Sequence, residues 1–237
     1  MPKCTTSSPG SDRAGDAARP GIAPTRRGLA TLGAGLAVSF LTGCSDDRKW
    51  HSIDVSNSSP PLAFTLTRAR DGKTVTAADY RGHIAMLYFG YTFCPDVCPT
   101  TLANVVTILD KIGPAGSGIR LLFVTVDPNR DTPAVLAKYV HNFSPQFDGL
   151  RGTPDQLAAV ARRYRVVYSV TPATKEHPYE VTHGSATYVF DGTGAARLLV
   201  PSLANANPDI AGTAADLKRL ATEHSDSGLF SRLRRMV

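Results

Sequence analysis

Two continuous apolar runs stand out within residues 62–224, whose other segments mix apolar and polar positions. The first, IAMLYFGY, covers residues 84–91, and the second, IRLLFVTVD, covers residues 119–127. Runs of this length without a polar face are typical of strands that are buried on both sides of a sheet. Between them, residues 100–112 carry apolar side chains at a spacing near 3.6, with Pro99 before them and Gly113-Pro114 after them. This pattern predicts a strand, a helix and a second strand.

Shorter elements flank this unit on both sides. Residues 63–82 alternate apolar and polar side chains around Asp71-Gly72, which predicts an N-terminal β-hairpin. Further strands are predicted at VVYSV (166–170), SATYVFD (185–191) and AARLLVPS (195–202), and helices from Thr132-Pro133 to His141, over 153–166 behind a Thr153/Gln156 capping box, and from Asn207-Pro208 to 224. The order predicts an α/β, thioredoxin-like fold, in which helices flank a central β-sheet.

The first 43 residues have the features of an export signal. Residues 28–43 are an uncharged stretch of 16 residues directly after Arg26-Arg27. This stretch is shorter than the ~20 residues of a spanning helix, and a basic start before a short apolar region is typical of a signal peptide. LTGC, at 41–44, resembles a bacterial lipobox, so we expect cleavage before Cys44 and lipid on that cysteine. Arg26-Arg27 predicts twin-arginine export, with the Sec route as the alternative.

An uncleaved N-terminal anchor is the other interpretation of this segment, and both place the remaining chain outside the cytoplasm on a membrane. Residues 44–61 are polar and end at Pro60-Pro61, which predicts a lipid anchor followed by a flexible tether. Residues 62–224 suffice for one domain with a single core, and residues 225–237 form a basic C-terminal tail.

The net charge of +6 does not indicate a nucleic-acid partner. Residues 1–43 contain five basic and two acidic residues, which leaves 21 basic against 18 acidic residues in the rest of the chain. Three of those basic residues belong to the C-terminal tail, so the domain itself is balanced. We therefore expect no basic face of the kind that binds nucleic acid.

Two of the four cysteines lie within five positions, in the sequence FCPDVCP. Cys94 and Cys98 follow the first buried strand and lead into a helix, at the sheet edge where ligands and reactive groups gather. A spacing of four places both sulfurs on one side of a helical turn, and the helix N-terminus is expected to lower the cysteine pKa. A disulfide that closes so short a loop adds little stability, which argues against a purely structural pair. A redox couple, a soft-metal site and a pair that alternates between both remain.

Two thiolates select Cu(I), and an added imidazole also holds Cu(II) or Zn(II). His183, in VTHGSATYVFD, precedes a predicted strand whose entry point packs against the active-site cysteines in a thioredoxin-like sheet. We therefore predict His183 as the third ligand, with His177 in a polar loop as the fallback. His83 lies at the far end of the first buried strand. The remaining histidines are expected to be solvated: His51, His141 and His224.

Three segments together resemble the Sco/SenC family. They are YFGYTFCPDVCPTTL (88–102), VTVDPNRDTP (124–133) and VTHGSATYVFD (181–191), and the resemblance extends over residues 62–224. Members of that family are membrane-tethered, thioredoxin-fold proteins that assist copper delivery to cytochrome c oxidase. The resemblance implies that Cys94, Cys98 and His183 bind copper as Cu(I) or Cu(II), and that the two cysteines can also form a redox-active disulfide.

The resemblance implies a metallochaperone on the periplasmic face of the bacterial inner membrane. Its receiver would be the subunit II copper centre of cytochrome c oxidase or another periplasmic copper carrier. The alternative is an extracytoplasmic thiol–disulfide oxidoreductase that keeps partner cysteines reduced. The three-residue spacer, His183, and Ala186 at the position of the thioredoxin cis-proline favour the metallochaperone. A peroxiredoxin-like peroxidase is disfavoured because no second set of peroxidatic features is present.

Two details of the motifs leave questions for the structure. Family members commonly carry Asp before the ligand histidine, whereas this chain has Thr182, which leaves open what orients the imidazole. Asp127 and Asp131 match the DPxxDT segment of the family. We expect them to form a turn and to cap the helix that begins at Pro133, and not to contact the metal.

Overall fold

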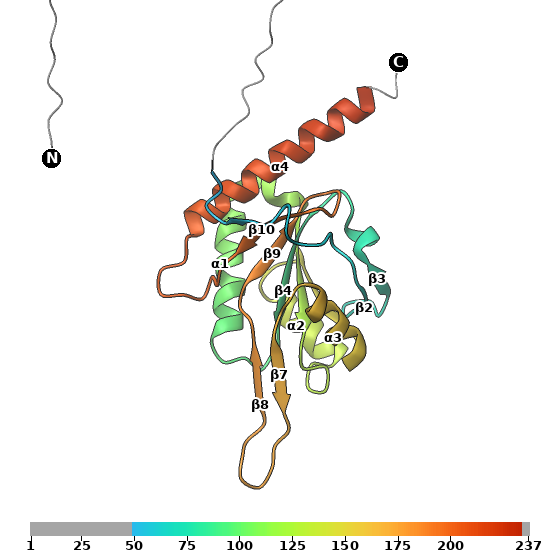
Figure 1. The fold of residues 1–237 in the computed structure, drawn as a ribbon, viewed down its shortest axis with the longest axis vertical. Coiled ribbons are helices and arrows are strands. Elements are labelled where there is room, and N and C mark those ends of the chain that lie inside the picture. Colours follow the sequence, from blue (N-terminus) through green and yellow to red (C-terminus); the bar gives the residue numbers. More distant parts are fainter. Residues whose placement is uncertain (1–48, 234–237) are drawn as a thin grey trace, which may run out of the picture. The chain divides into compact units, whose positions relative to one another are not determined.

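An eight-stranded sheet, with the strand order β1-β10-β9-β4-β5-β6-β2-β3, forms the centre of the protein (Figure 1). The computed structural model describes residues 49–233, with side chains described to residue 223. The predicted signal peptide and the predicted lipidation site, Cys44, therefore lie outside the described residues. The strands of this sheet are β1 (Ile53–Asp54), β2 (Thr65–Arg68), β3 (Thr74–Thr76), β4 (Ile84–Gly90), β5 (Ile119–Thr125), β6 (Phe147–Arg151), β9 (Thr187–Phe190) and β10 (Ala196–Val200).

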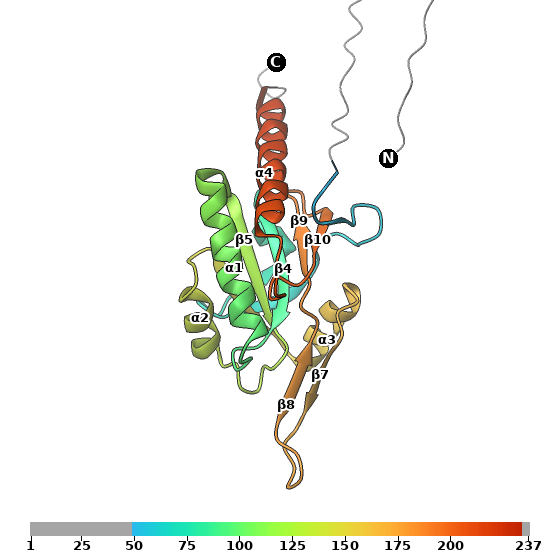
Figure 2. The same ribbon diagram turned by 90° about the vertical axis from the view of Figure 1, so that its left-hand side faces the viewer.

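A separate two-stranded sheet pairs β7 (Tyr168–Thr171) with β8 (Glu180–His183). In Figures 1 and 2 this hairpin extends beyond the main sheet, at the end opposite helix α4. The α-helices are α1 (Val97–Ile112), α2 (Pro133–His141), α3 (Pro154–Arg163) and α4 (Ile210–Leu233), and two 3₁₀ turns cover η1 (Ala77–Tyr80) and η2 (Gly113–Gly118). No helix among the described residues has the length and hydropathy needed to cross a bilayer.

The two apolar runs form the central parallel pair, as their pattern predicts. β4 and β5 run parallel from Ile84 opposite Ile119 to Gly90 opposite Thr125, and every residue of β4 is buried. One face of the sheet packs against α1, α2 and α4, and the other packs against α3 and the segment before β2. The thioredoxin-like α/β fold, with helices on both faces and an N-terminal β2–β3 hairpin, is thus confirmed.

Three strands are missing from the sequence prediction. β6 contains a glycine and an aspartate, and β1 is only two residues long, so neither shows a strand pattern. β8, with the sequence EVTH, has three polar residues and is paired only with β7. Its omission matters most, because it places His183 at the end of a strand of its own.

The segment predicted as a flexible tether is packed where the structure describes it. Ile53 and Asp54 pair with Leu199 and Leu198 of β10, and the backbone N–H groups of His51 and Ser52 donate to the buried carboxylate of Asp216 in α4, at 3.1 and 2.7 Å. Because the run is polar, its pairing with β10 and α4 could not be read from apolar periodicity. The prediction of a flexible tether is therefore wrong for residues 49–55.

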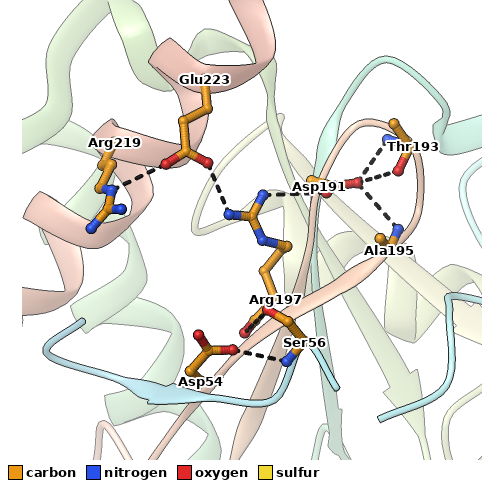
Figure 3. A network of polar contacts seen from close by, with 8 residues as sticks. All are labelled: Asp54, Ser56, Asp191, Thr193, Ala195, Arg197, Arg219 and Glu223. Atoms are coloured by element: carbon orange, nitrogen blue, oxygen red, sulfur yellow. Dashed lines mark hydrogen bonds and ion pairs between the residues drawn. The ribbon is translucent and has the colours of Figure 1, made fainter. Parts of the chain in front are cut away.

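An arginine and carboxylate network joins β10 to α4 at this end of the molecule (Figure 3). Arg197 of β10 lies between Asp191 and Glu223, at 3.4 and 2.8 Å, and Glu223 also pairs with Arg219 at 3.0 Å. The guanidinium carbon of Arg219 lies 4.0 Å from the Trp50 ring centre. α4 then continues to Leu233, so most of the predicted basic tail from residue 225 is helical.

Candidate metal centre

The two cysteines are positioned by the central strand and the helix that follows it. β4 ends at Gly90, Cys94 lies in the short connection, and Cys98 is in the first turn of α1. The Cys98 side chain is fully buried and that of Cys94 is half-buried. The backbone N–H of Cys98 donates to the Cys94 sulfur at 3.4 Å, so the helix start orients one thiol toward the other. Both are free thiols.

Gly90 makes room for this arrangement. A Cβ atom at position 90 would lie 2.6 Å from the Cys98 sulfur and 2.9 Å from Cζ of Phe123, which is closer than such atoms approach in proteins. Here glycine is required by the close approach of the cysteine side chain and not by its backbone angles. The absence of a side chain at Gly90 therefore allows the Cys98 sulfur to pack directly against the end of β4.

His183 reaches the cysteines from β8, where it pairs with Tyr168 of β7. Its Nε2 atom lies 3.3 Å from the Cys98 sulfur, and its Nδ1 atom lies 3.0 Å from the carbonyl oxygen of Gly184. A carbonyl oxygen only accepts, so Nδ1 carries the hydrogen and the Nε2 lone pair faces the thiols. The backbone of Gly184 thus orients the imidazole in place of the aspartate that Thr182 replaces.

The structure brings all three predicted site residues together. The sulfurs of Cys94 and Cys98 and a ring nitrogen of His183 lie within 4.8 Å of one another. Burial lowers the pKa of His183, which keeps the imidazole neutral and available as a donor. Two sulfur donors and one nitrogen donor suit soft or borderline ions, and copper above all. The ligand role of these residues stays a prediction, but their geometry fits it.

The expectation that the helix N-terminus lowers the cysteine pKa is wrong for Cys98. Burial raises the pKa of the Cys98 thiol to about 12, because a fully enclosed sulfur loses the hydration that stabilises its thiolate. The Tyr88 hydroxyl, 3.7 Å from this sulfur, is a donor that opposes burial, but the effect of burial is larger. Cys98 is therefore a protonated thiol in the metal-free protein near neutral pH.

The other described histidines lie away from this centre. His177 is exposed in the loop between β7 and β8, and its backbone bonds with Thr174. The His83 ring contacts the carbonyl oxygen of Gly118 at 3.2 Å, and His51 lies 3.6 Å from Asp209. None of them is part of the Cys94, Cys98 and His183 group among the described residues.

Comparison with known proteins identifies the family. The model of the SCO1/SenC family matches residues 57–221, which is more than half of the chain. A mitochondrial SCO2 homolog of Bos taurus is 35% identical over 189 residues, covering 77% of this chain and 71% of that protein. The chain belongs to the SCO1/SenC family.

Two solved SCO1/SenC relatives carry copper. The copper-bound structure of Arabidopsis thaliana ScoI is 32% identical, with a TM-score of 0.61, and covers 69% of this chain and 98% of that one. The copper-bound structure of Bradyrhizobium japonicum ScoI is 36% identical, with a TM-score of 0.59, and covers 68% of this chain and 99% of that one. The resemblance read from the sequence segments is thereby confirmed.

The two aspartates of the SCO1/SenC motif DPxxDT do more than form a turn. Asp131 accepts hydrogen bonds from the backbone N–H and the hydroxyl of Thr92 and from the hydroxyl of Thr125. The cap of α2 is instead Thr132, whose hydroxyl accepts from the backbone N–H of Val135. The predicted capping role of Asp131 is therefore wrong, because its carboxylate is used to hold the loop that carries Cys94.

Two tyrosines next to the SCO1/SenC cysteine motif escaped the sequence analysis. Tyr88 is fully buried below Cys98, and Tyr91 donates from its hydroxyl to the carbonyl oxygen of Val181 in β8, at 3.3 Å. The rings of both meet the His183 ring edge-on, with centres 6.1 and 5.7 Å away. The signal available for Tyr88 was its position two residues before Gly90, because residues two apart in a strand point to the same face. That face of β4 packs against α1.

Proposed function

We propose that this SCO1/SenC protein is a copper metallochaperone that delivers copper to the subunit II copper centre of cytochrome c oxidase. The observation that carries the proposal is the grouping of two thiols and one neutral imidazole within 4.8 Å. Support comes from the two ScoI relatives of the same family whose structures have copper bound. Other periplasmic copper carriers are receivers of the same chemical class.

The donor set accounts for binding of both oxidation states. Cu(I) is soft and is satisfied by two thiolates, whereas Cu(II) favours an added imidazole in a tetragonal arrangement. Binding must displace the proton from Cys98, whose thiol has a pKa of about 12 in the metal-free protein. Loading is therefore accompanied by proton release and weakens as the pH falls.

Release to a receiver is best explained by ligand exchange from the exposed side of the site. Cys94 and His183 are half-buried, whereas Cys98 is fully enclosed. An incoming donor from the receiver reaches the first two ligands before the third. Copper would thus leave in steps, with Cys98 as the last protein ligand.

The cellular arrangement forms part of the proposal. A signal peptide that ends before Cys44 and lipid on that residue would hold the domain on the periplasmic face of the bacterial inner membrane. Cys44→Ser should leave uncleaved precursor without a lipid label. If the Ser variant is processed normally and remains equally membrane-bound, the anchor is of another kind.

The decisive experiment combines loading with transfer. The purified protein is titrated with Cu(I) and Cu(II), its copper content is measured, and the loaded protein is mixed with a copper-free subunit II copper domain. We expect the protein to load one copper per chain. After mixing, the two proteins are separated, and the copper should be found in the receiver. The Cys94→Ser/Cys98→Ser variant is the matched control and should neither load nor transfer.

A thiol–disulfide oxidoreductase remains the second candidate. The observation that favours it is the pair of free cysteines in which the N–H of Cys98 already donates to the Cys94 sulfur. This function takes over if copper binding is negligible and the reduced protein instead reduces a disulfide between the cysteines of subunit II, while Cys94 and Cys98 are oxidised to a disulfide.

A further inference from the structure

Arg130 occupies the space between the two segments that carry the metal ligands. It lies in the connection between β5 and α2, in the motif DPNRDTP. Its guanidinium carbon is 4.1 Å from the Tyr179 ring centre, 4.8 Å from that of Phe93 and 5.6 Å from that of Tyr91. Phe93 directly precedes Cys94, and Tyr179 directly precedes β8, which ends at His183. One arginine thus contacts both sides of the site.

A buried carboxylate fixes this arginine in place. Asp127 is fully buried, accepts from Nε of Arg130 at 2.5 Å, and accepts from the Tyr179 hydroxyl at 2.8 Å. The Tyr179 side chain is therefore held twice, by its ring against the guanidinium and by its hydroxyl against Asp127. A planar guanidinium suits this position because it pairs with a carboxylate and stacks on rings at the same time.

We propose that Arg130 is a positioning residue that braces β8 against the cysteine loop and so holds His183 at the cysteine pair. β8 pairs only with β7 and lies outside the main sheet, so the sheet hydrogen bonds do not fix His183 relative to Cys94. The Arg130 cluster and the hydrogen bond from Tyr91 to Val181 supply contacts between the two segments. This inference rests on the proposed function, since it concerns how the copper site is assembled.

The first test is Arg130→Gln, which removes the ion pair and the ring contacts. Loss of a group that bonds directly to a metal ligand typically costs about 10- to 100-fold in metal affinity, and that range is the upper limit here because Arg130 acts one contact further out. We expect such a loss for Cu(II), together with weaker thiolate-to-copper absorption, and a nearly unchanged affinity for Cu(I). In the metal-free protein, the His183 ring resonances should lose the shifts caused by Tyr88 and Tyr91. Arg163→Gln, which removes a cation–π contact between the last residue of α3 and Tyr164 and hydrogen bonds to the Pro61 carbonyl, is the matched control and should change none of these.

A double-mutant cycle identifies the route of the effect. If Arg130 acts through His183, then Arg130→Gln should have no further effect on Cu(II) affinity in a His183→Ala background. Asp127→Asn/Arg130→Gln removes both charges, so that no buried carboxylate is left unpaired, and it should show the same Cu(II) loss with a retained circular dichroism spectrum. Tyr179→Phe, which keeps the ring and removes the hydroxyl, should give a smaller loss than Arg130→Gln.

The outcomes separate this inference from the proposed function. Negligible copper binding by the unmodified protein would overturn the function. If the unmodified protein binds copper, and the folded Asp127→Asn/Arg130→Gln variant has the same Cu(II) affinity and spectrum, only the positioning role of Arg130 would be overturned. Equal losses of Cu(I) and Cu(II), or additive effects in the double-mutant cycle, would do the same, because both indicate a general structural role.

Discussion

The two halves of the metal centre are built differently. The cysteines belong to the main domain: β4 lies between β5 and β9 in the sheet, and α1 packs on its face, with Cys98 fully buried. His183 belongs to a two-stranded hairpin outside that sheet, and its side chain is half-buried. The thiol half is thus held by the core, and the imidazole half is held by contacts between loops.

This difference matches the needs of a copper carrier. A rigid thiol pair retains Cu(I), which two thiolates satisfy, and a separately mounted imidazole adds the donor that Cu(II) favours. The opposite end of the molecule offers a further contrast. Arg197 and Arg219 both pair with Glu223 there (Figure 3), and both guanidinium groups lie over the Trp50 ring of the N-terminal segment. The molecule thus contains two arginine and aromatic clusters, one beside the Cys94, Cys98 and His183 group and one where the N-terminal segment packs against β10 and α4.

The largest effect is expected from Cys94→Ser/Cys98→Ser. Removal of both thiols should abolish binding of Cu(I) and Cu(II), because one imidazole cannot hold either ion alone. The fold should survive, because the core consists of two hydrophobic clusters, one on each face of the sheet, and neither depends on the metal. Copper analysis and far-UV circular dichroism test this together, and a collapsed spectrum would show that the pair is structural.

The two thiols should differ strongly in reactivity in the metal-free protein. The thiolate is the nucleophile, and burial, which raises the pKa of the Cys98 thiol to about 12, keeps that thiol protonated at pH 8. Iodoacetamide should therefore modify Cys94 first, and Cys98 should become reactive as the pH rises toward 12 or when urea unfolds the chain. Mass spectrometry of peptides reports the order, and equal rates in the folded protein would contradict the burial of Cys98.

Gly90→Ala should affect both stability and copper binding. The added methyl group would overlap the Cys98 sulfur and the Phe123 ring, and overpacking of this kind costs about 1–3 kcal/mol of unfolding free energy. Urea titration and Cu(I) affinity measure the two effects. Gly184→Ala is the control beside His183, because its Cβ would meet only ordinary contacts, the nearest at 3.8 Å. Equal behaviour of the two variants would contradict the close approach at Gly90.

The smallest effect on copper is expected from Asp216→Asn. Asp216 accepts from the N–H groups of His51 and Ser52, and loss of such charge-assisted bonds costs about 1–3 kcal/mol. Hydrogen exchange of residues 50–55 should become faster, whereas copper affinity should not change. Asp54→Asn changes an exposed carboxylate that accepts from the N–H of Ser56, and it is the matched control for stability. A change in copper affinity on Asp216→Asn would show that the two ends of the molecule are coupled.

The sequence was most informative where buried apolar residues follow one another or recur at a regular spacing. The β4 and β5 runs and the α1 pattern predicted the central unit, and the thiol spacing with the position of His183 predicted the grouping of the candidate ligands. These signals succeed because buried strands and helix faces require apolar residues at fixed intervals.

The remainder depended on contacts between distant segments. Nothing in EVTH indicates a strand, because three of its four residues are polar and its strand partner is the separate segment β7. Nothing in the polar stretch before Pro60 indicates that Asp216 binds its backbone. The orientation of the His183 ring by the carbonyl of Gly184 was left open by the sequence, because no residue pattern reveals a backbone contact. Burial also reversed the expected direction of the Cys98 pKa, because the depth of a side chain is a tertiary property.

The most direct test of the two-part site is the response of His183→Ala to the two copper ions. Each variant is titrated with Cu(II) against a competing chelator and with Cu(I) under anaerobic conditions, and the thiolate-to-copper bands are recorded. We expect His183→Ala to bind Cu(II) much more weakly with altered bands and to retain most of its Cu(I) affinity, while His177→Ala in the exposed loop matches the unmodified protein. Unchanged Cu(II) affinity and spectrum in His183→Ala, or a loss in His177→Ala instead, would contradict the account.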